Sequence, residues 1–261
     1  MGAGPLRDAL TLLLGLATGV LSGAFGIGGA VISTPGIRLL GASATLAIGS
    51  TLPSVLPSSI AGTLRYHREK LVEWRAVEWV VPPGIIASIG GALLTDVLPG
   101  NGHPLQIATA FLLGLNAVRL MRPTEASASV AHVGGRPKRP RLVLIGLLSG
   151  GLSGLLGIGG GVVMVPAFTH WAGMSLKRAI GTSLACVGMF AVPGTITHAA
   201  IGNIDWHFAV LLSVAVVPGA RIGSAFAVKA TDARLRTSVG LFLALVATAF
   251  AVGETIALVR S

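Results

Sequence analysis

Long apolar stretches alternate with short basic segments along this chain of 261 residues. Eight stretches carry few or no charges, and each has about 18 residues or more, enough for a helix that spans a bilayer. They cover residues 9–40, 45–64, 76–97, 104–121, 142–172, 179–200, 206–228 and 237–258. The pattern predicts an all-α polytopic membrane protein.

The composition strengthens this prediction. Only 11% of the residues are charged and 52% are hydrophobic, whereas a soluble domain carries about 25% charged residues. The chain could not cover a globule with solvated side chains, which excludes a soluble enzyme. A net charge of +10 would suggest nucleic acid in a soluble protein, but aromatic residues make up only 5%, too few for a base-stacking surface. We expect no nucleic-acid partner.

The positive charges mark a topology. Fifteen of the 19 Lys and Arg residues lie in four clusters, within residues 65–75, 119–141, 177–178 and 229–236. Under the positive-inside rule these clusters are cytoplasmic, and the connections at 99–103 and 202–205, which lack Lys and Arg, are external.

The first apolar segment of each half does not fit eight plain crossings. Segment 142–172 is bounded by basic residues at both ends, so it should enter the membrane and return, as a re-entrant hairpin or a broken helix. Segment 9–40 would then start and finish outside, and the two halves would be inverted. Eight plain crossings are the alternative, but they put one or two basic clusters on the wrong side of the membrane.

The two halves repeat in sequence. Seven positions of the first half recur 131 residues later, namely Ser22, Gly23, Gly26, Ile27, Gly28, Gly29 and Pro35, and residues 48–52 match 180–184. We therefore predict a first repeat over 1–121, a basic cytoplasmic linker over 122–141 and a second repeat over 142–261. Each repeat has about four apolar segments, the first of them broken by glycine.

The glycine runs are the candidate substrate site. Successive glycines weaken a helix by about 1 kcal/mol each relative to alanine, and the freed backbone must be buried in protein or face a wet cavity. A helix that restarts after the break directs its N–H groups and positive dipole end at a small anion. The candidates are Ser22, Gly28, Gly29, Ser153, Gly159, Gly160 and Gly161. The alternative is that these glycines only allow close helix packing.

Hydroxyl pairs and one arginine complete the candidate site. Ser50, Thr51, Thr182 and Ser183 recur in the two halves near the start of the second segment and could bind an oxyanion, or else bond to helix backbone. Arg221 lies within an apolar span, where arginine is a functional candidate. Its alternatives are a snorkelling position and a pair with Glu78 or Glu254.

These residues carry a family resemblance. The pattern Ser-Gly-x-x-Gly-x-Gly-Gly, present from Ser22 and from Ser153 and followed in each half by Ile-Gly-(Ser/Thr)-(Thr/Ser)-Leu, resembles the sulfite exporter TauE/SafE family of membrane transporters. The resemblance covers nearly the whole chain outside the linker. It implies about eight apolar segments in two repeats, and transport of sulfite, organosulfonates or related organic acids across the bacterial inner membrane.

The sequence thus predicts a secondary transporter with a small anionic substrate, the lipid bilayer as surroundings, and a proton or sodium ion as the candidate coupling ion. No metal-ligand spacing or nucleotide fingerprint occurs, so no metal and no cofactor are expected. A passive anion channel is one alternative. The other is an intramembrane serine protease, because Gly151-Leu-Ser153-Gly154 fits a Gly-x-Ser-Gly motif and His198 follows; Tyr66 in place of a matching histidine in the first half argues against it.

Overall fold

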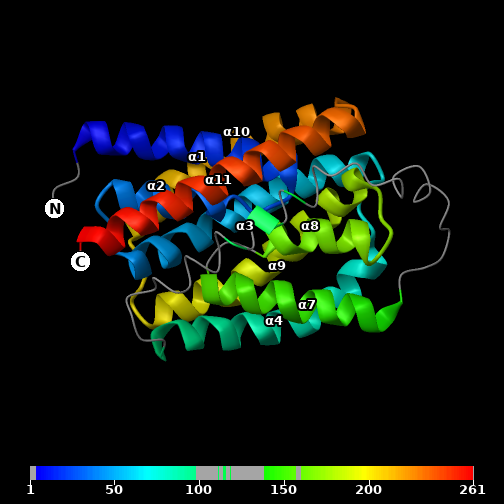
Figure 1. Ribbon diagram of the computed structural model, residues 1–261, viewed down its shortest axis with the longest axis horizontal. Coiled ribbons are helices and arrows are strands. Elements are labelled where there is room, and N and C mark those ends of the chain that lie inside the picture. Colours follow the sequence, from blue (N-terminus) through cyan, green and yellow to red (C-terminus); the bar gives the residue numbers. More distant parts are fainter. Residues whose placement is uncertain are drawn as a thin grey trace.

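The structure is a computed structural model that describes residues 4–97, 111, 114–115, 118, 138–156 and 160–260. All regular structure in those ranges is helical, so the predicted all-α class is confirmed. The helices are α1 (Pro5–Phe25), α2 (Ala30–Leu39), α3 (Ala44–Arg68), α4 (Trp74–Val97), α7 (Arg139–Leu156), α8 (Gly161–His170), α9 (Leu176–Ala200), α10 (Trp206–Lys229) and α11 (Asp232–Arg260). They lie roughly side by side in an elongated bundle (Figure 1).

Four helices in the described part are long and apolar enough to cross a membrane. They are Pro5–Phe25, Trp74–Leu94, Leu176–Ala200 and Trp206–Lys229. Helix α3 is as long as α9 but carries serine and threonine along its buried side. The expected span 104–121 falls almost wholly outside the described residues, as does the linker 122–141, of which the last residues begin α7.

Glycine breaks the first segment of each half into two helices. Helix α1 ends and α2 begins around Gly26, Gly28 and Gly29, whose φ angles are 71°, 79° and 77°. Helix α8 begins after Gly160, with a φ of 65°. A left-handed conformation costs other residues about 1–2 kcal/mol each, so glycine is what allows the chain to turn here. The predicted breaks are confirmed at these positions.

Two parallel helix pairs flank the bundle (Figure 1). Helix α1 packs along α10, and α7 packs along α4. Glycines spaced by four residues make these contacts so close that a methyl group on Gly19 would overlap the carbonyl oxygen of Val216, and one on Gly154 that of Ser88. Close packing is therefore the role of these two glycines; Gly154 belongs to the repeated motif, and Gly19 lies three residues before the first copy of it.

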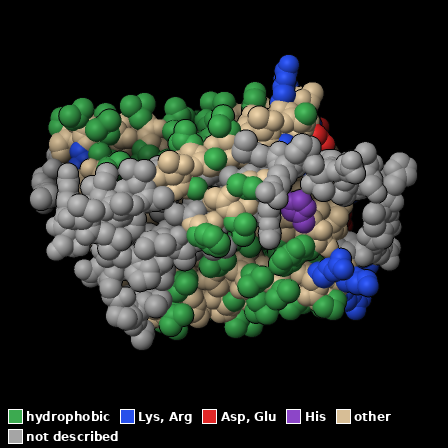
Figure 2. Space-filling view, viewed as in Figure 1, with side chains coloured by type: hydrophobic (Ala, Val, Ile, Leu, Met, Phe, Trp, Pro, Cys, Tyr) green, Lys and Arg blue, Asp and Glu red, His purple; other side chains and the backbone are tan. Residues whose placement is uncertain are grey.

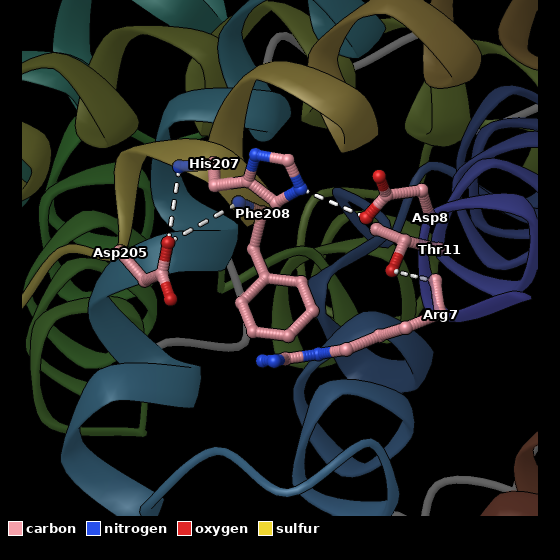
Figure 3. Close-up of polar contacts among 6 residues, drawn as sticks. All are labelled: Arg7, Asp8, Thr11, Asp205, His207 and Phe208. Carbon is pink, nitrogen blue, oxygen red and sulfur yellow. Dashed lines mark hydrogen bonds and ion pairs between the residues drawn. The ribbon is translucent and has the colours of Figure 1, made fainter. Parts of the chain in front are cut away.

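The helix ends show which way each hairpin opens. Helices α1 and α10 begin at the same end, where Asp8 Oδ1 lies 2.8 Å from His207 Nε2 and the Arg7 guanidinium lies 4.3 Å from the Phe208 ring centre (Figure 3). Asp205 caps α10 there through the N–H groups of His207 and Phe208.

Helix α3 also begins at that end, because the N–H of Asp205 donates to Ser50 Oγ at 2.8 Å. The hairpin formed by α1 and α2 thus starts and finishes at one end of the bundle. Helices α7, α4 and α9 begin at the other: Arg139 stacks on the Trp79 ring at 4.8 Å, and the N–H of Glu73 donates to Thr182 Oγ1 at 3.0 Å. The hairpin formed by α7 and α8 opens there.

Basic residues gather at the end where α7 begins. Lys177 Nζ donates to the carbonyl of Val228 near the last turn of α10, and Arg141 donates to the carbonyl of Trp171. On the face shown in Figure 2, Lys and Arg side chains lie mainly toward the right-hand end, and hydrophobic side chains cover much of the flank. Basic side chains therefore lie mainly at one end of this face, and apolar side chains lie along its flank.

Candidate substrate site at the helix breaks

The break in the first half touches elements of the second half. A methyl group on Gly161 would overlap the Gly26 carbonyl oxygen and would lie 2.7 Å from Ile27 Cα. Ser183 Oγ donates to the same Gly26 oxygen at 2.8 Å. The turn that joins α1 to α2 is therefore held against the start of α8 and the first turns of α9. The two segments that the sequence singled out come together inside the bundle.

Buried hydroxyls surround the first break. Ser22 lies at the end of α1 and accepts a hydrogen bond from Ser58 Oγ of α3 at 2.9 Å, with both side chains buried. This arrangement leaves the Ser22 hydroxyl with its own hydrogen to donate. Thr18 lies one turn earlier, with its methyl group Cγ2 toward Gly29. Its side-chain oxygen is buried and has no hydrogen-bond partner among the described residues, which is uncommon in a folded interior.

The start of α2 adds backbone donors to these hydroxyls. Gly29 is its N-cap and provides no side chain to cap the helix. The first N–H groups of a helix have no partner within the helix, and the positive dipole end favours an anion. Ten residues of helix follow this cap. The first break therefore combines hydroxyl and N–H donors in one buried place.

The second break carries a similar buried hydroxyl. Ser153 is buried, lies against Gly160, and its oxygen has no hydrogen-bond partner among the described residues. Gly160 caps α8 without a side-chain bond, as Gly29 caps α2. The candidate Gly159 lies outside the described residues.

The hydroxyl pairs are engaged by protein groups. Ser50 and Thr182 each accept from a backbone N–H of the other half, as described above. Thr51 donates to the carbonyl of Ile48 at 2.9 Å, and Ser183 donates to Gly26. All four hydroxyls therefore bond to backbone groups, those of Ser50 and Thr182 to the residues just before α10 and α4, and Ser183 is the one that contacts a break.

Arg221 does not join these residues. Its side chain is exposed on α10, in a part of the helix that is otherwise packed against α1. An exposed arginine on an apolar helix can extend its guanidinium toward an interface, which is the snorkelling alternative.

Thr18 and Ser58 lie beside the first break and were missed by the sequence motifs. Thr18 precedes Ser22 by four residues, so both lie on one face of α1. That spacing could have identified Thr18 from the sequence as a neighbour of Ser22. No sequence pattern identifies Ser58, because its contact with Ser22 joins two different helices.

The described part also has a shallow cleft of about 240 Å³ between α3 and α10, lined by Pro53, Trp206, Ala209, Val210, Ser213 and Val214. Most of these side chains belong to the outer face of α10, and none lies at a break. No group of three His, Cys, Asp or Glu side chains in the described ranges could hold a metal ion. The hydroxyl-lined break is thus the better candidate for binding a solute.

Comparison with known proteins places this arrangement in a family. The family model for the sulfite exporter TauE/SafE matches residues 11–250. The chain belongs to the TauE/SafE family. The matched region contains both glycine breaks and every helix from α2 to α10, so the TauE/SafE match covers the whole candidate site.

Curated relatives agree over most of their length. The chain is 26% identical over 226 residues to Probable membrane transporter protein YjnA of Bacillus subtilis, covering 82% of this chain and 87% of the relative. It is 24% identical over 247 residues to Probable membrane transporter protein MJ0441 of Methanocaldococcus jannaschii, covering 87% and 89%. No solved structure matches the chain. This TauE/SafE protein is therefore a membrane transporter and not an enzyme, which sets the serine-protease alternative aside.

Proposed function

We propose that this protein is a multi-pass secondary transporter of the inner membrane that moves small anions such as sulfite, organosulfonates or related organic acids. The observation that carries the proposal is the first helix break, where Ser22, Thr18 and the uncapped start of α2 offer hydrogen-bond donors inside the bundle. Secondary transporters bind substrates at such discontinuous helices. The family description supports a sulfur-containing anion.

We further propose that the two halves, 1–121 and 142–261, are inverted repeats joined by a cytoplasmic linker. Equivalent contacts support this. Ser50 accepts from the N–H of Asp205, and Thr182, its counterpart 132 residues later, accepts from the N–H of Glu73, the counterpart of Asp205. The parallel pairs α1 with α10 and α7 with α4 are counterparts in the same way. If the two halves exchanged conformations, the site would open first to one side of the membrane and then to the other.

Single cysteines test the proposed topology. The native thiol, Cys186, is buried, so an impermeant thiol reagent should report only introduced cysteines. We expect Leu6→Cys and Thr45→Cys, at the two ends of the first hairpin, to be labelled from outside, and Arg68→Cys from the cytoplasmic side. All three positions are exposed. Labelling of Leu6→Cys and Thr45→Cys from opposite sides would contradict a re-entrant hairpin.

Counterflow in proteoliposomes tests the function itself. Vesicles loaded with unlabelled sulfite should take up labelled sulfite or organosulfonate in a saturable, trans-stimulated manner. Imposed proton and sodium gradients would then identify the coupling ion by which of them drives accumulation. An ohmic anion current without trans-stimulation would favour the channel, and the absence of anion flux would reject both.

A further inference from the structure

The donors around the first break are all uncharged. They are the hydroxyls of Ser22 and Thr18 and the backbone N–H groups at the start of α2, while Ser58 donates its hydrogen to Ser22. Among the described residues, the buried side chains with N–H or O–H groups are serines, threonines, Tyr66 and one histidine, with no lysine, arginine, aspartate or glutamate. An anion at this break would therefore meet dipoles and no opposite charge from the buried described side chains.

The one buried histidine of the described part is far from the first break, measured along helix α9. His198 belongs to the last turn of α9, whereas Ser183, which contacts Gly26, belongs to its second turn. The 15 residues between them correspond to about 22 Å of helix. Four basic side chains of the described part have other surroundings: Lys177 and Arg141 bond to carbonyls near helix ends, Arg65 pairs with Glu69, and Arg221 is exposed.

Charge determines what such a site can hold. The cost of moving an ion from water into a low-dielectric interior rises with the square of its charge, so a dianion costs roughly four times as much as a monoanion of the same size. Hydrogen bonds from neutral donors and a helix dipole recover part of that cost, but they rise only in proportion to the charge. A site without a buried cation therefore favours the singly charged form of an anion.

Resting on the proposed function, we propose that this protein selects monovalent oxyanions: hydrogen sulfite and alkyl sulfonates bind at the first break, and the dianions sulfite and sulfate are rejected. Hydroxyls and N–H groups match the three oxygens of a sulfonate, each of which accepts hydrogen bonds. The outer substituent, a proton in hydrogen sulfite or an alkyl group in a sulfonate, needs no charged partner.

The test compares three anions in proteoliposomes that contain the full chain. Methanesulfonate keeps one charge at all accessible pH values, sulfate keeps two, and sulfite changes from one to two near neutral pH. We expect sulfite flux to fall about tenfold over two pH units that span this ionisation, in proportion to the monoanion. Methanesulfonate flux should stay nearly constant and so controls for any effect of pH on the protein. Sulfate should neither be transported nor compete.

The possible failures are distinguishable. Sulfate flux comparable to methanesulfonate flux, or sulfite flux that holds or rises as the dianion forms, would overturn the selectivity and leave an anion transporter. The absence of flux for all three anions would overturn the selectivity and the proposed function together.

Discussion

Replacing Gly29 with alanine should weaken anion binding without unfolding the protein. Two effects add at this position. The backbone has a φ of 77°, which costs a residue with a side chain about 1–2 kcal/mol. The new methyl group would also lie 2.8 Å from Thr18 Cγ2 and 3.2 Å from Ser22 Cβ, and so would crowd the two hydroxyl side chains of the site. Overpacking of this kind costs about 1–3 kcal/mol.

Gly202 supplies a matched control. Its φ is 75°, and no atom lies within 4 Å of a methyl group built there. Gly202→Ala should therefore lose about the same 1–2 kcal/mol of stability through backbone strain alone. In counterflow assays we expect Gly29→Ala to raise the KM for methanesulfonate by about fivefold or more, and Gly202→Ala to leave it unchanged. Equal KM values in two well-folded variants would refute the assignment of Gly29 to the site.

Two further predictions use neighbouring residues as controls. In α4, Gly91→Ala should lower the stability of the purified protein by about 1–3 kcal/mol, because the methyl group would overlap the Gly151 carbonyl oxygen. The control Gly90→Ala places its methyl group in open space and should be neutral or stabilising. Equal melting temperatures for the two variants would contradict the close pairing of α4 with α7. In α3, Ser58→Ala should raise the KM for methanesulfonate by about two- to tenfold through loss of the bond to Ser22. Ser54→Ala, whose hydroxyl donates only to the Thr51 carbonyl of its own helix, should keep the wild-type KM, and a shared change would argue against a role for Ser58.

The sequence was informative about the breaks because their cause is local. Only glycine adopts a left-handed conformation at low cost, so a Gly-Ile-Gly-Gly run inside an apolar segment predicts a chain turn before any tertiary contact is known. Gly26, Gly28 and Gly29 confirm this. The same motif also contains Gly23, which faces the α10 backbone. The four-residue spacing of Gly15, Gly19 and Gly23 indicates such packing, but the motif alone did not separate the two roles.

The role of the repeated hydroxyls depended on contacts across the chain. Ser50 meets the N–H of Asp205, 155 residues away, and no local pattern indicates that partner. The sequence of an apolar helix does not distinguish a serine that bonds to the backbone of another element from a serine that binds a substrate. The orientation of Arg221 was undetermined for a related reason, because α10 is apolar on both its packed and its exposed sides.

Anomalous scattering would test the central claim, that the first helix break binds the transported anion. Crystals of the protein grown with selenite, a heavier analogue of sulfite, should show an anomalous selenium peak within hydrogen-bonding distance of Ser22 and the start of α2. Gly29→Ala crystals should lack that peak. A selenium peak beside Arg221 or in the cleft between α3 and α10, with none at the break, would contradict the account.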